Sequence, residues 1–95
     1  MNKPLIKFGN VIVNVNNITT VTPVKPEVLS EFRAYEYEDT LGEEKYQQLI
    51  KDARGLDDTE IVAYMISLTY EGGGNSTNFV ISIEDSERLF KLFGN

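Results

Sequence analysis

The sequence predicts an α+β fold, namely an antiparallel sheet of about five strands with a helical insertion at about residues 27–54 and a C-terminal helix at about residues 85–93. Three observations predict it. Apolar and polar side chains alternate along residues 61–70 and again along residues 77–83, which is typical of strands. Shorter alternating runs occupy the first 24 residues, and apolar residues recur at helical spacing after Pro26, after Thr40 and near the C-terminus.

The first third of the chain is predicted to be a small meander of three strands. Residues 5–8 and 11–15 form a hairpin that turns at Gly9 and Asn10, a dipeptide suited to a tight reversal. A third strand, residues 18–24, follows a turn at Asn16 and Asn17. Pro23 restricts this strand to an edge or an end of the sheet, because proline has no N–H to donate.

The helical insertion is predicted to hold two helices. Pro26 suits the first position of a helix, and four apolar residues follow it at helical spacing, although residues 35–38 alternate and leave helix or strand open. Thr40 and Glu43 form a capping-box pattern at the start of a second helix, residues 41–54. Its buried stripe consists of Tyr46, Leu49, Ile50 and Ala53, and Gly55 ends it.

The central hairpin, residues 61–83, is the strongest structural signal. Its first strand is apolar on both faces at one end, which predicts a position inside the sheet. The glycine-rich loop at residues 71–76 leads into another strand and contains no lysine, so we interpret it as a hairpin loop and not as a phosphate-binding loop. Ser82 is a candidate cap for the last helix, which places Leu89, Phe90, Leu92 and Phe93 on one side and ends at Gly94.

The composition limits how many domains the chain can form, what chemistry it can perform and where it is expected to be located. Ninety-five residues predict a single domain, residues 1–95. The chain lacks cysteine and histidine, which removes the commonest nucleophile–base pairs, and no pattern indicates a cofactor or a metal site, so we expect a protein that is not an enzyme. A carboxylate-based enzyme is the least favoured alternative. With no signal peptide and no apolar run long enough for a membrane span, we expect a cytoplasmic protein that does not bind membranes.

The negative charge is concentrated in the middle of the chain. The net charge is −6, and residues 27–60 hold eleven acidic residues against four basic ones. Direct nucleic-acid binding is therefore not expected, because phosphate contacts need clustered Lys and Arg. Acidic residues interleaved with tyrosines are either a solvated helical face or a surface for a basic protein partner. The candidate partner-binding residues are Tyr35, Glu36, Tyr37, Glu38, Asp39, Glu43, Glu44 and Tyr46.

A second hypothesis uses the scattered arginines. In a homo-oligomer, Arg33, Arg54 and Arg88, together with Asn75, could bind a small nucleotide between subunits and sequester it. This arrangement depends on the fold to gather residues that are far apart in the sequence.

Residues 11–21 and 66–93 run in the order strand, Asn turn, strand, then strand, Gly loop, strand and terminal helix. This order resembles small pleckstrin-homology-like domains of bacteria and phages, over about half of the chain and without a diagnostic motif. A compact acidic chain without Cys, His or Trp also resembles phage or mobile-element accessory proteins, many of which inhibit host defences. These resemblances imply a small binding module and assign no functional residues. The favoured function is a non-enzymatic interaction module that acts as a homo-oligomer or in a complex.

Overall fold

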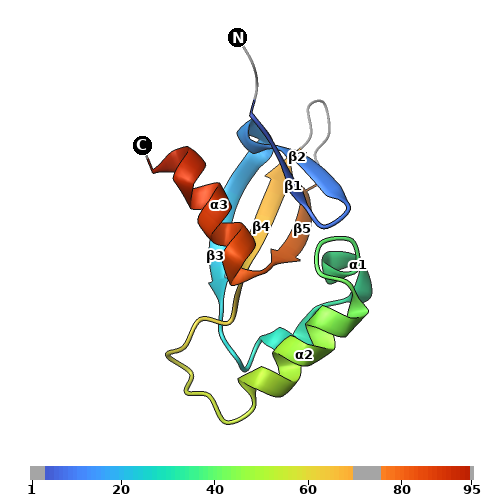
Figure 1. The fold of residues 1–95 in the computed structure, drawn as a ribbon, viewed down its shortest axis with the longest axis vertical. Coiled ribbons are helices and arrows are strands. Elements are labelled where there is room, and N and C mark those ends of the chain that lie inside the picture. The colour runs from blue at the N-terminus through green and yellow to red at the C-terminus, as the bar shows by residue number, and fades with distance from the viewer. Residues whose placement is uncertain (1–3, 70–75, 95) are drawn as a thin grey trace.

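The computed structural model describes residues 4–69 and 76–94, and its α+β architecture confirms the predicted fold class (Figure 1). Within these residues, five strands and three α-helices follow one another, with two short 3-10 helices between them. In order they are β1 (Leu5–Phe8), β2 (Val11–Asn14), η1 (Val15–Asn17), β3 (Ile18–Val24), η2 (Leu29–Glu31), α1 (Ala34–Tyr37), α2 (Glu43–Ala53), β4 (Ala63–Thr69), β5 (Ser76–Ile81) and α3 (Ile83–Phe93). The strands are divided between two antiparallel sheets, β1-β2 and β3-β4-β5.

The three-stranded sheet has β4 at its centre, as the apolar pattern of residues 61–70 predicted. Ile66 at the middle of β4 is fully buried, and it pairs with Val21 on β3 and Phe79 on β5. Pro23 lies on β3, an edge strand of this sheet, so its missing N–H costs no ladder bond inside the sheet.

One face of this sheet is covered by the β1-β2 hairpin and by α3, which lie side by side across it (Figure 1). Together they enclose the first hydrophobic core: Ile6, Phe8, Val13, Val15, Ile66, Leu68, Phe79, Ile81 and Leu89. The hairpin turns at Gly9 and Asn10 as predicted, with Gly9 at a positive φ of 59°.

The second core lies on the opposite face of the three-stranded sheet, against the helical insertion, because Val80 alternates along β5 with Phe79 and Ile81 of the first core. It consists of Val24, Leu29, Tyr37, Tyr46, Ala53, Ala63 and Val80. The predicted buried stripe of α2 is confirmed, because Tyr46, Leu49, Ile50 and Ala53 all pack in or against this core. Gly55 follows α2 at a φ of 84°, the left-handed backbone expected of the residue that ends a helix.

The segment after Pro26 is broken, where the sequence predicted a continuous helix. Only the three-residue η2 and the four-residue α1 form, and the backbone between them is extended at Phe32 and Arg33. Residues 35–38, which the pattern left open between helix and strand, fall in and just after α1. The break allows Leu29 and Tyr37 to enter the same core from two separate turns.

The capping-box prediction for α2 is wrong. The N-cap is Gly42, at a φ of 84°, and no side chain caps the helix there. Thr40 is 5% exposed and turns inward, where its hydroxyl donates to the carbonyl of Val80 on β5. A hydrogen bond across the core is therefore formed in place of the local bond that the sequence pattern predicted.

The last helix begins two residues earlier than predicted, and it buries fewer of its apolar side chains than the pattern indicated. The side chain of Ser82 accepts a hydrogen bond from the Asp85 N–H, which confirms the cap. Leu89 is fully buried, but Phe90, Leu92 and Phe93 are 38%, 50% and 52% exposed. These four residues spread over roughly 160° of a helix surface, so the sheet cannot cover them all.

Candidate functional site

The acidic residues gather where α1 turns into α2. We define the acidic surface as Glu36, Glu38, Asp39, Glu43 and Glu44, of which Glu36 is partly buried and the other four are exposed. They come from α1, from the link that follows it and from the first turn of α2. The predicted acidic residues are thus brought onto one corner of the fold.

This corner is held in place by hydrogen bonds to both sheets. The Asn10 N–H at the hairpin turn donates to the Asp39 carbonyl at 2.7 Å. Next to it, the Thr40 hydroxyl donates to the Val80 carbonyl on β5. The amides of Leu41 and Gly42 both donate to the Tyr37 carbonyl, at 2.8 and 3.1 Å. The acidic surface is therefore displayed on a fixed backbone.

Two of the five carboxylates have local structural roles. The Glu36 carboxylate accepts from the Arg33 backbone N–H at 2.9 Å, which satisfies a free donor at the start of α1. The Glu43 carboxylate accepts from the Gln47 side chain at 3.1 Å and lies 3.5 Å from the Tyr37 hydroxyl. Glu43 and Glu44 also occupy the first turn of α2, where the helix dipole favours negative charge.

The other three carboxylates have no partner in the described part of the chain. The side chains of Glu38, Asp39 and Glu44 make no hydrogen bond there. The one ion pair among residues 4–69 and 76–94 joins Arg88 to Asp85, in α3. No Lys or Arg within these residues therefore forms an ion pair with the acidic surface.

The tyrosines do not behave as the sequence predicted. Tyr35 is 61% exposed and lies beside the acidic residues, but Tyr37 and Tyr46 are buried, at 7% and 3%. Burial first, and then the charge of Glu43, raises the pKa of Tyr37. Burial first, and then Tyr37, raises the pKa of Tyr46, whose hydroxyl donates to the Leu29 carbonyl. Tyr37 and Tyr46 thus belong to the second core, and only Tyr35 remains as an aromatic partner-binding candidate.

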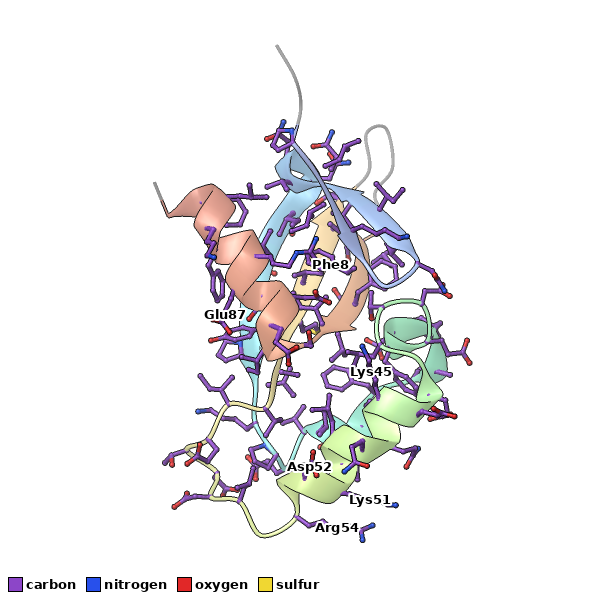
Figure 2. All side chains as sticks on the ribbon, in the orientation of Figure 1. Phe8, Lys45, Lys51, Asp52, Arg54 and Glu87 are labelled. Carbon is purple, nitrogen blue, oxygen red and sulfur yellow. The ribbon has the colours of Figure 1, made fainter. Side chains whose placement is uncertain are left out.

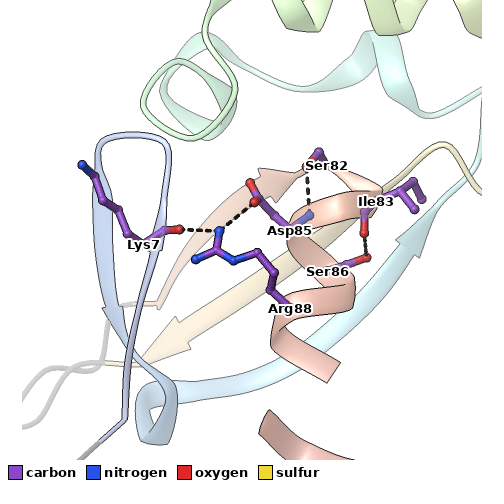
Figure 3. Close-up of polar contacts among 6 residues, drawn as sticks. All are labelled: Lys7, Ser82, Ile83, Asp85, Ser86 and Arg88. Atoms are coloured by element: carbon purple, nitrogen blue, oxygen red, sulfur yellow. Dashed lines mark hydrogen bonds and ion pairs between the residues drawn. The ribbon is translucent and has the colours of Figure 1, made fainter. Parts of the chain in front are cut away.

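The arginines of the alternative hypothesis lie on separate elements. Arg33 precedes α1, Arg54 follows the last turn of α2, and Arg88 lies on α3. Figure 3 shows the Arg88 guanidinium already engaged, with one nitrogen donating to the Lys7 carbonyl at 3.0 Å and to the Asp85 carboxylate at 2.9 Å. Arg54 lies at the end of α2 that points away from α3 (Figure 2). Asn75 lies outside the described residues.

A cleft that the sequence did not predict lies between α2 and the start of α3. Its volume is about 230 Å³, and it is lined by Leu41, Lys45, Gln48, Leu49, Asp52, Ser82 and Glu84. Figure 2 shows Lys45 and Asp52 on α2. No sequence pattern could reveal it, because its two walls are about thirty residues apart in the chain.

The buried hydroxyls have structural roles. The side chains of Thr40 and Ser86 donate to the backbone carbonyls of Val80 and Ile83. Among residues 4–69 and 76–94, no group of three Asp or Glu side chains is placed to hold a metal ion. The Thr40 hydroxyl thus links the segment before α2 to β5, and the Ser86 hydroxyl bonds within the first turn of α3.

Comparison with protein-family models, with curated proteins and with solved structures finds no match to this chain. The resemblance to pleckstrin-homology-like domains therefore stays a prediction. Within the described residues, no helix is long and apolar enough to span a membrane.

Proposed function

We propose that this chain is a non-enzymatic interaction module and that the acidic surface binds a basic protein partner. The observation that carries the proposal is the set of three unpaired carboxylates, Glu38, Asp39 and Glu44, on a backbone fixed by the hairpin and by β5. Such a surface attracts an oppositely charged partner from a distance and orients it during encounter.

The surroundings of these carboxylates support a protein partner. Tyr35 is the exposed aromatic residue of this corner, and tyrosine is enriched at protein interfaces because it combines a large apolar ring with a hydroxyl. A fixed backbone also lowers the conformational entropy lost on binding. Inhibition of a host system, which the likeness to phage accessory proteins implies, is one activity that such a surface could serve.

A charge-reversal experiment tests the proposal. The test variant carries Glu38→Lys, Asp39→Lys and Glu44→Lys. The control variant carries Glu27→Lys, Asp58→Lys and Glu60→Lys, three exposed residues elsewhere in the chain. Both variants have the same net charge, so a difference between them reports the position of the charge. Surface substitutions of this kind usually change stability by only about 0.5 kcal/mol each.

The readout is the protein captured from the cells that naturally contain the chain. We expect the wild-type chain and the control variant to capture the same protein, and the test variant to lose it. Capture should also weaken as salt concentration rises, because ions screen charges beyond about 8–10 Å. Equal capture by both variants would contradict the proposal and leave the acidic surface as a solvated face. Loss of capture only in an Arg33→Ala or Arg54→Ala variant would favour the nucleotide-binding hypothesis.

A further inference from the structure

The outer flank of α3 carries apolar side chains that the fold leaves exposed. Ile83 and Phe90 are 36% and 38% exposed and lie seven residues apart, almost two helical turns, so they lie on the same side of the helix. The Phe90 ring is held edge-on against Tyr64 of β4, with ring centroids 5.2 Å apart and planes at 87°. Phe90 is therefore an aromatic side chain in a fixed orientation at the surface.

A shallow depression, widely open to solvent, lies beside this ring. Its volume is about 380 Å³, and it is lined by Glu87, Phe90, Lys91 and Gly94. We define the α3 flank as Ile83, Glu87, Phe90 and Lys91. It combines an exposed aromatic ring, a space beside that ring and one charge of each sign, all on one side of one helix.

The charges of α3 are divided along its length. Asp85 and Arg88 neutralise each other through their 2.9 Å ion pair. Of the remaining charged residues, the acidic Glu84 and Glu87 precede the basic Lys91, and all three are exposed. The helix therefore has an acidic first half and a basic end.

We propose that the α3 flank is the interface of a homodimer in which the two α3 helices pack antiparallel about a two-fold axis. The occupant is a second copy of this chain, because an antiparallel arrangement brings the acidic half of each helix against the basic end of the other. Glu87 of one copy then lies near Lys91 of the second copy, and each Phe90 covers apolar surface of the opposite flank. A two-fold interface needs such a self-complementary surface.

The size of the α3 flank determines how strongly the two copies are expected to associate. An eleven-residue helix is roughly 16 Å long. A typical stable interface buries about 800 Å² of each partner, and one helix flank provides less than that. We therefore expect a reversible dimer with a dissociation constant on the order of 10 μM. The dimer should weaken at high salt, because its charge pairs lie at the surface.

Sedimentation velocity of the full chain, from about 1 μM to about 1 mM, tests the dimer. Three variants report on the pairing: Lys91→Glu, Glu87→Lys and the double exchange Glu87→Lys/Lys91→Glu. We expect each single variant to raise the dissociation constant by about tenfold, and the double exchange to return it to within about threefold of wild type. The two single variants change net charge in opposite directions, so a loss common to both reflects local pairing. Circular dichroism checks that each variant is folded.

Any of three outcomes would overturn the inference. The first is a wild-type chain that stays monomeric across the whole concentration range. The second is a dimer in which the double exchange is as weak as the single variants. The Glu38→Lys/Asp39→Lys/Glu44→Lys variant should dimerise as wild type does, since the acidic surface lies on different elements from α3. Dimerisation lost in this variant but kept in the α3 single variants would also contradict the inference, because it would assign self-association to the acidic surface.

Discussion

The ring of Tyr37 lies flat against the ring of Tyr46, with centroids 3.6 Å apart and planes inclined by 11°. This stack joins α1 to α2 inside the second core, directly beneath the acidic surface. The hydroxyl of Tyr46 donates to the Leu29 carbonyl, and that of Tyr37 lies near Glu43. Two residues that the sequence placed at a partner surface thus support that surface from below.

Because of the stacked tyrosines, the stability of the fold should decrease at alkaline pH. Burial raises the pKa of Tyr37 and Tyr46 above the ordinary value of 10.0. Between pH 10 and these raised values the unfolded chain loses the phenolic protons first, so the stability present below pH 10 is lost as pH rises further. Urea unfolding at a series of pH values should show this decline. It should be shallower in Tyr37→Phe and Tyr46→Phe, while Tyr35→Phe, at an exposed position, should follow wild type.

Thr40 should behave as a buried donor and not as a helix cap. Thr40→Val keeps the shape of the side chain but leaves the Val80 carbonyl without its hydrogen bond, at an expected cost of about 1–3 kcal/mol. Thr40→Ser keeps the hydroxyl and should cost less. Thr40→Asn separates the two roles, because asparagine is an excellent N-cap but is too large for a site that is 5% exposed. A Thr40→Asn chain as stable as wild type in chemical denaturation would contradict the buried role.

Gly9 should not tolerate a side chain. It has a φ of 59°, and a Cβ there would lie 2.5 Å from the carbonyl oxygens of both Asp39 and Thr40. Gly9→Ala should therefore destabilise the fold by about 2 kcal/mol or more, through strain and the displacement of this link. Gly55→Ala is the matched control, since Gly55 also has a positive φ, but a Cβ there would meet no atom of the described residues within 4 Å apart from its chain neighbours. Equal melting temperatures for the two variants would show that the hairpin turn does not pack against the link.

Ile66 should be essential for folding. It is fully buried at the centre of β4, where a carboxylate would have no partner. Ile66→Asp should unfold the domain, because an unpaired buried charge costs several kcal/mol against a total stability of about 5–10 kcal/mol. Ile12→Asp is the control, at a strand position that is 66% exposed. Circular dichroism distinguishes the two, and a cooperative melt of Ile66→Asp near the wild-type temperature would mean that β4 is misplaced.

Part of the candidate site could be predicted from the sequence. The run from Glu36 to Glu44 is continuous enough that any compact fold keeps its carboxylates together, since ionised side chains are rarely buried without a partner. The roles of the tyrosines could not be predicted. Tyr35 and Tyr37 are two residues apart on one short helix, yet one is 61% exposed and the other 7%. The direction of that helix depends on the extended backbone at Arg33, which no local pattern indicates.

Local sequence patterns were sufficient to predict an element wherever the spacing of the residues is compatible with only one kind of local structure. Alternation placed β1, β2, β3 and β4 correctly, Gly9 and Gly55 marked backbone reversals, and Ser82 capped α3. Tertiary structure decided what depended on residues distant in the chain. The division of the strands into two sheets and the exposure of Phe90 depend on which surfaces the hairpin and α3 can cover together. The inward turn of Thr40 toward Val80 depends on the packing of the helical insertion against β5. Periodicity specifies which side of an element is apolar, but only packing against the remaining elements decides whether that side is buried.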